Sequence, residues 1–151
     1  MKTLILGLGN PILSDDSVGL RVAEFLKGKL ADRDTTVIES TTSGLGLLDI
    51  LIGYDQAIII DAIQTEGDKI GEIYHFKVED FKAGDHVVSS HGINLAAVLE
   101  LGEKLGLTLP QDFDIIAVGI PQECPFGEEC TPEVQRAIPL AAEVVVKKIS
   151  T

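Results

Sequence analysis

The fold of this chain is decided by residues 3–26, which read TLILGLGNPILSDDSVGLRVAEFL. Residues 3–8 are an apolar run of the length expected for a fully buried strand, and a glycine-containing turn follows them. From Asp16 to residue 30 the apolar residues recur at helical spacing, which predicts a helix capped by Ser14 or Asp15. A buried strand, a turn and an amphipathic helix form the unit from which parallel α/β sheets are built.

The rest of the chain repeats this alternation of strand and helix. Further buried strands are predicted at residues 35–39, 56–61 and 113–119. Further helices are predicted at residues 47–52, at residues 91–105 and from Thr131 and Pro132 onward. These elements predict one α/β domain over residues 1–151, with a parallel sheet that is covered on both faces.

Two segments depart from this simple pattern. Residues 70–77 alternate between polar and apolar side chains, so we expect them to form a strand at an edge of the sheet. Pro139 lies inside the last predicted helix, where it should either kink that helix or split it in two. Gly106 should end the helix predicted at residues 91–105.

Composition excludes several classes of function. The 151 residues, of which 45% are hydrophobic, can bury one sizeable core. The 24 acidic and 12 basic residues give a net charge of -12, which argues against binding to nucleic acid or to an anionic membrane surface. Such a charge serves solubility, or a basic partner or a metal. No signal peptide and no apolar run of ~20 residues is present, so we expect a cytoplasmic protein without membrane insertion.

The two cysteines carry little information on their own. Cys124 and Cys130 have a C-x5-C spacing that matches no common zinc pattern. In the cytoplasm they would be reduced. We interpret them as ordinary loop thiols, with an accessory metal or redox role as the alternative.

The glycine turn at residues 7–9 invites a dinucleotide-binding interpretation, in which Glu39 would be the acid that binds the ribose. The third glycine of that fingerprint is missing, since position 12 is Ile12. Asp15 and Asp16 stand at the helix start, where a pyrophosphate needs bare amides. Two negative charges there repel an anion and suit a cation, so nucleotide binding is disfavoured.

Three polar side chains stand where predicted strands meet predicted helices: Asp16, Asp61 and His91. In an open α/β sheet these positions converge on one crevice, so we expect the three side chains to meet there. Two carboxylates and one imidazole suit a divalent metal of borderline hardness. Structural roles are the alternatives, since Asp16 complements the helix dipole and Asp61 can cap the following turn.

Taken together, these segments resemble the hydrogenase maturation endopeptidases, which process the large subunit of nickel-iron hydrogenases. The most specific match is G-x-G-N with D-D five residues after the Asn, here residues 7–16. Four shorter segments also match the family: Asp61-Ala62, Ser90-His91-Gly92, the Thr-Ser-Gly-Leu loop at residues 42–45 and the Gly-Ile-Pro segment at residues 119–121.

The resemblance implies a three-layer α/β/α fold with a twisted, mostly parallel five-stranded sheet. One strand would be antiparallel, and residues 70–77 are the natural candidate. It also implies that Asp16, Asp61 and His91 are the catalytic residues and the metal ligands. This chain has Asp16 where many members have Glu, which shortens the ligand by one methylene, and Ser17 where many have Gly.

The resemblance further implies a metal-dependent endopeptidase that removes the C-terminal extension of a nickel-iron hydrogenase large-subunit precursor after nickel insertion. The nickel then belongs to the precursor, and other divalent metals are expected to substitute in vitro. The alternative is a non-cleaving, nickel-sensing chaperone or scaffold of the same fold.

Substrate binding is expected at the end of the second predicted strand. That strand lies beside the first in the usual doubly wound order, so its end should open into the same crevice. We therefore expect Glu39 and the turn at residues 41–46 to border the cleft, with Thr42, Ser43 and Gly44 contacting substrate. The resemblance implies an acid near this position, and a solvated strand-end carboxylate is the alternative for Glu39.

Overall fold

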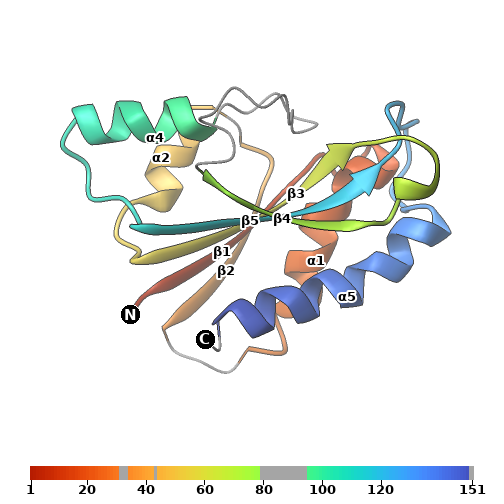
Figure 1. Ribbon diagram of the computed structural model, residues 1–151, viewed down its shortest axis with the longest axis horizontal. Coiled ribbons are helices and arrows are strands. Elements are labelled where there is room, and N and C mark those ends of the chain that lie inside the picture. Colours follow the sequence, from red (N-terminus) through yellow and green to blue (C-terminus); the bar gives the residue numbers. More distant parts are fainter. Residues whose placement is uncertain (31–33, 43, 79–94, 150–151) are drawn as a thin grey trace.

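A computed structural model describes residues 1–30, 34–42, 44–78 and 95–149. A five-stranded sheet lies between two layers of helices (Figure 1). The strands are β1 Thr3–Leu8, β2 Thr35–Ser40, β3 Gln56–Gln64, β4 Ile73–Lys77 and β5 Asp112–Ile120. The helices and 3-10 turns are η1 Ser14–Ser17, α1 Val18–Leu26, α2 Gly46–Leu51, η2 Gly67–Lys69, α4 Leu95–Lys104 and α5 Pro132–Ile149. No helix among these residues is long and apolar enough to cross a membrane.

The strand order is β2-β1-β3-β5-β4, and only β4 runs antiparallel to its neighbour. This arrangement confirms the predicted mostly parallel sheet and the edge position of the alternating strand. β2 lies beside β1, as the doubly wound order predicts.

Two apolar layers cover the faces of the sheet. Because side chains alternate along a strand, each strand supplies residues to both layers. α1 and α5 cover one face, where Ile5, Ile58, Ile60 and Ile116 are fully buried. α2 and α4 cover the other face, over the buried side chains of Leu4, Leu6, Ala57 and Ile59.

The first helix differs from the prediction at its start. Residues 14–17 form the 3-10 turn η1, and α1 begins only at Val18. Neither Ser14 nor Asp15 caps the helix, since no side-chain cap is formed at either element. The reason is that the carboxylate of Asp15 binds Thr131, far along the chain.

The third strand is longer than predicted. Asp61 does not end β3, which continues to Gln64 because it keeps pairing with β5 through Gln64 and Ile120. Its pairing with β1 stops at Ile60. Asp61 is therefore the first residue of β3 that pairs with β5 and no longer with β1.

Glycines let α1 lie directly on the sheet. A Cβ at Gly19 would lie 2.2 Å from the carbonyl oxygen of Leu8 and 2.5 Å from that of Ile60. A Cβ at Gly7 would lie 2.3 Å from the carbonyl oxygen of Gly19 and 2.6 Å from the Cβ of Ala23. The first glycine of the turn at residues 7–9 thus serves helix packing.

The two later helices largely follow the prediction. α4 is described from Leu95 to Lys104, and residues 91–94 of the predicted helix lie outside the described residues. Gly106 follows it at φ +75°, the left-handed conformation that ends helices. α5 begins at Pro132 and runs through Pro139 as one helix to Ile149, so the alternative that Pro139 splits the helix is wrong.

Candidate functional site

Two loops meet at the carboxyl ends of the strands and hold η1 in place. The Gly127 N–H donates to the carbonyl oxygen of Ile12 at 2.8 Å, and the Ser14 N–H donates to that of Gly127 at 2.8 Å. Asp15 accepts hydrogen bonds from the N–H of Thr131 at 2.6 Å and from its hydroxyl at 2.9 Å. Asp15 therefore ties η1 to the residue that precedes α5, where a helix terminus favours negative charge.

Asp16 follows in the same turn and is 6% exposed. Its carbonyl oxygen accepts a hydrogen bond from the Asn10 N–H at 3.3 Å. A Cβ at Gly9 would lie 2.6 Å from this oxygen, so the second glycine of the turn lets the backbone close onto Asp16. The G-x-G-N motif thus shapes the loop that presents this acid.

Asp61 lies on β3 and is 4% exposed. Burial raises the pKa of its carboxyl well above 3.8, and the Ala62 N–H, which donates to Oδ1 at 2.8 Å, acts in the opposite direction. The negative charge of Asp16 raises this pKa further. The convergence of these two acids with His91 at one site stays a prediction.

The third predicted ligand, His91, lies outside the described residues. Among the residues that are described, no group of three His, Cys, Asp or Glu side chains could hold a metal ion. The pair that is described still fits a cation, because two buried carboxylates that repel each other are stabilised by positive charge between them. The three-residue ligand set stays a prediction.

Glu39 lies on the face of the sheet that α1 covers, and its carboxylate has a lysine partner there. Its carboxylate binds Lys27 Nζ at 2.6 Å, just beyond the end of α1. Glu39 pairs with Gly7 in the register of β2 and β1, and Gly7 faces α1. Ile60 packs on the face that α1 and α5 cover. Because side chains alternate along a strand, Asp61 lies on the other face, which α2 and α4 cover. A substrate role for Glu39 stays a prediction, and it would require substrate to reach the α1 face.

The turn after β2 is partly described. The Thr42 N–H donates to the hydroxyl of Ser40 at 3.0 Å, and Gly44 has φ +63°, which favours glycine. Ser43 lies outside the described residues. Substrate contacts by Thr42, Ser43 and Gly44 stay predictions.

Both cysteines lie beside the acidic turn, which their spacing did not indicate. Cys130 Sγ is 3.7 Å from the hydroxyl of Ser17 and 3.8 Å from the carbonyl oxygen of Ser14. Burial raises the pKa of the Cys124 and Cys130 thiols above 9.0, and the charge of Asp15 raises both further. Thiols with raised pKa values are poor nucleophiles at neutral pH, so neither suits a cysteine protease.

Comparisons with known proteins identify the family of this chain. A family model described as hydrogenase maturation protease matches residues 20–148. The hydrogenase 2 maturation protease of Escherichia coli K12 is 30% identical over 148 residues, which cover 97% of this chain and 89% of that protein. The chain belongs to the hydrogenase maturation protease family. The family model begins after Asp16, so the acidic turn is compared only through full-length relatives.

Solved structures of family members share the fold. The hydrogenase maturating endopeptidase HybD from Escherichia coli has a TM-score of 0.83 at 28% identity, with 99% of this chain and 93% of that chain covered. The nickel-iron hydrogenase maturation protease HybD from Thermococcus kodakarensis has a TM-score of 0.73 at 27% identity, with 97% and 98% covered. The mixed five-stranded sheet is therefore the sheet of this family.

A second polar cluster lies away from the acidic turn and was not predicted. Asp114 on β5 is fully buried, and its Oδ1 accepts hydrogen bonds from His75 and, at 2.8 Å, from Lys77. Lys148 of α5 lies 3.5 Å from the same oxygen. Burial alone would raise the pKa of Asp114, but Lys77 and His75 lower it below 3.8. The cluster joins β4, β5 and α5, which is a structural role.

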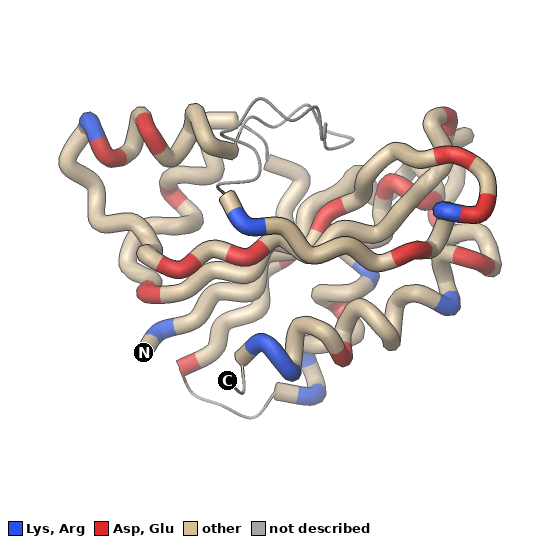
Figure 2. Tube along the Cα trace, in the orientation of Figure 1, with Lys and Arg blue, Asp and Glu red and all other residues tan. Residues whose placement is uncertain are grey.

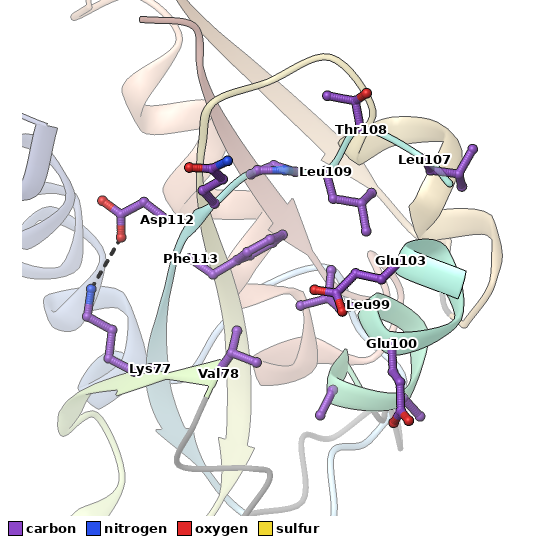
Figure 3. Close-up of a pocket in the computed structure, with 14 residues that line it drawn as sticks. Lys77, Val78, Leu99, Glu100, Glu103, Leu107, Thr108, Leu109, Asp112 and Phe113 are labelled. Atoms are coloured by element: carbon purple, nitrogen blue, oxygen red, sulfur yellow. Dashed lines mark hydrogen bonds and ion pairs between the residues drawn. The ribbon is translucent and has the colours of Figure 1, made fainter. Parts of the chain in front are cut away.

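A cavity of about 1150 Å³ lies between α4 and the start of β5 (Figure 3). Leu99 and Phe113 line it together with Glu103. Phe113 is the second residue of β5, whereas Asp61 pairs with Ala117 farther along that strand. The cavity therefore lies at the other end of the sheet from the acid pair.

Proposed function

We propose that this family member is a metal-dependent endopeptidase that removes the C-terminal extension of a nickel-iron hydrogenase large-subunit precursor after nickel insertion. Membership of the maturation protease family supports proteolysis in hydrogenase maturation. The observation that carries the metal dependence is the pair of buried carboxylates, Asp16 and Asp61. Burial raises the pKa of Asp61 and the charge of Asp16 raises it further, which favours a bound cation.

Asp16 and Asp61, joined by His91, would hold the nickel of the precursor. Three protein ligands leave the remaining positions of a six-coordinate ion to the precursor and to water. When bound there, nickel or a substituting divalent metal supplies Lewis acidity at the scissile carbonyl or lowers the pKa of a water. The nickel would belong to the precursor and so be part of the substrate.

The chain's own residues prepare this site. The Ala62 N–H orients the Asp61 carboxylate at 2.8 Å, and Asp15 holds η1 against Thr131 so that Asp16 keeps its place. Both acids are largely buried. Because the pKa of Asp61 is raised, this carboxyl retains a proton more readily than a solvated acid and releases it when a cation binds.

The proposed partner is the large-subunit precursor, in the cytoplasm. Incubation of the purified protein with nickel-loaded precursor tests the proposal, with the released extension detected by mass spectrometry. Cleavage is expected. An unprocessed precursor under every metal condition would overturn the endopeptidase and favour a chaperone or scaffold of the same fold.

A further inference from the structure

Two large apolar side chains are exposed beside the acidic turn. Phe126 is 84% exposed and Ile12 is 51% exposed. Single exposed apolar residues are ordinary on protein surfaces. These two differ because their loops are hydrogen-bonded to each other: the Gly127 N–H donates to the carbonyl oxygen of Ile12 at 2.8 Å. Ile12 and Phe126 are thus two exposed apolar residues on loops that are far apart in sequence and joined by a backbone hydrogen bond, and we call them the apolar patch.

The backbone that carries the patch is fixed to the candidate site. The Ser14 N–H donates to the carbonyl oxygen of Gly127, and the Ile12 N–H donates to Oδ1 of Asn10 at 3.1 Å. The Asn10 N–H in turn donates to the carbonyl oxygen of Asp16. A ligand on the patch would therefore lie a short, hydrogen-bonded stretch of backbone from Asp16.

Negative charge surrounds the patch. Glu123, Glu128 and Glu129 are exposed in the same loop as Phe126. Acidic positions also gather in Figure 2 at the end of the molecule where β1, β3 and β5 end. The guanidinium of Arg21 donates to the carbonyl oxygen of Glu128 at 2.8 Å and lies 3.6 Å from Glu24, which leaves its charge largely compensated. A partner that matches this surface in charge and hydrophobicity is a basic segment with an exposed apolar side chain.

We propose that Phe126 and Ile12, with Glu123, Glu128 and Glu129 around them, form a docking surface for a basic, apolar segment of the protein substrate. This inference rests on the proposed function, because it assigns the docking segment to the same precursor. An aromatic side chain at the centre of a patch is a common anchor in protein interfaces, and the acidic rim selects the sign of the partner's charge.

Binding and cleavage measured separately test the docking surface. The probe is the nickel-loaded large-subunit precursor of a nickel-iron hydrogenase from the same organism. Phe126→Ala should raise Kd by calorimetry and KM for cleavage about tenfold each, with kcat within about twofold, as truncation of an interface anchor predicts. Leu105→Ala is the matched control, since Leu105 is 62% exposed beyond the end of α4. It should change neither constant.

The partner's chemistry is tested by photo-crosslinking from position 126 to the purified precursor. We expect the linked peptide to contain Lys or Arg beside an apolar residue, and binding to weaken as salt is raised. A linked peptide that is acidic or uncharged would overturn the proposal. So would a Kd unchanged by Phe126→Ala, or a dimer in sedimentation without precursor that Phe126→Ala dissolves, since a second copy would then be the occupant.

Failure of the docking surface and failure of the proposed function give different results. If the wild-type protein binds the precursor without cleaving it, proteolysis is contradicted and the docking surface is decided by the Kd of Phe126→Ala alone. If cleavage proceeds with unchanged constants in Phe126→Ala and Ile12→Ala, only the docking surface is overturned. If the wild-type protein neither binds nor cleaves, both are overturned.

Discussion

The carboxylate of Asp15 accepts hydrogen bonds from the N–H and the hydroxyl of Thr131, at 2.6 and 2.9 Å. Its neighbour Asp16 instead acts on the pKa of Asp61 through its charge. The two adjacent aspartates thus have different tasks: the first fixes the turn, and the second belongs to the candidate site.

Removal of the Asp15–Thr131 contact should lower stability. Asp15→Ala and Thr131→Val should each reduce the free energy of unfolding by about 1–3 kcal/mol, because the first removes the acceptor of the Thr131 N–H and hydroxyl and the second removes the hydroxyl that donates to the buried Asp15 carboxylate. In urea unfolding the double variant should lose less than the sum of the two single losses, with a coupling of about 1–2 kcal/mol. Strictly additive losses would mean that the two side chains do not depend on each other.

Gly19→Ala should unfold at a clearly lower temperature. Its new Cβ would lie 2.2 Å from one backbone oxygen and 2.5 Å from another, so α1 must move off the sheet. Overpacking of this kind costs about 1–3 kcal/mol or more. Gly28→Ala is the control, since nothing lies within 4 Å of a Cβ there. Equal melting temperatures for the two variants would contradict the close approach of helix and sheet.

Asp114 should make stability depend on pH in acid. Burial would raise its pKa, but Lys77 and His75 lower it below 3.8, the value expected in the unfolded chain. A lowered folded-state pKa gives stability that is fully present above the unfolded value and is lost as pH falls through the folded value.

Asp114→Asn tests this dependence. At neutral pH the variant should lose about 1.5–3 kcal/mol, because it removes the charged acceptor of the His75 and Lys77 hydrogen bonds. The difference from wild type should shrink as the pH of the unfolding experiment falls below 3.8. A difference that grows in acid would reverse the sign and contradict the assignment. Asp112→Asn is a suitable comparison, because Asp112 is exposed and lies 3.4 Å from Lys77.

Glu39→Gln should slow processing of the precursor if Glu39 contacts substrate. The Lys27–Glu39 pair is partly exposed, so its loss should change stability by less than about 1 kcal/mol. Lys27→Met removes the same ion pair and keeps the Glu39 carboxylate. Slow processing in Glu39→Gln alone would support substrate contact, whereas unaltered kinetics would remove Glu39 from the site.

The fold could be predicted from the sequence because its signals are local. Near-continuous apolar runs mark the buried strands, and the alternation at residues 70–77 marks the edge strand β4. A helix begins at Pro132 and another ends before Gly106, because the backbone conformations that proline and glycine prefer suit those positions. None of these inferences needs a distant part of the chain.

The details that could not be predicted depend on distant partners. The length of β3 beyond Asp61 follows from its pairing with β5, and the task of Asp15 follows from Thr131, 116 positions away. Gly19 looks like any helical glycine until α1 lies on the sheet. The convergence of Asp16, Asp61 and His91 stays a prediction, which rests on the carboxyl edge that parallel strands share.

Cleavage of nickel-loaded and nickel-free precursor by the same purified protein is the most direct test of the metal-dependent endopeptidase. The nickel-loaded precursor should lose its extension, and the nickel-free form should stay intact. Asp16→Ala, Asp61→Ala and His91→Ala should each abolish most of this processing and still fold, whereas Asp16→Glu should be milder because the family accepts either acid. Efficient cleavage of nickel-free precursor, or full activity in Asp16→Ala or Asp61→Ala, would contradict the proposal.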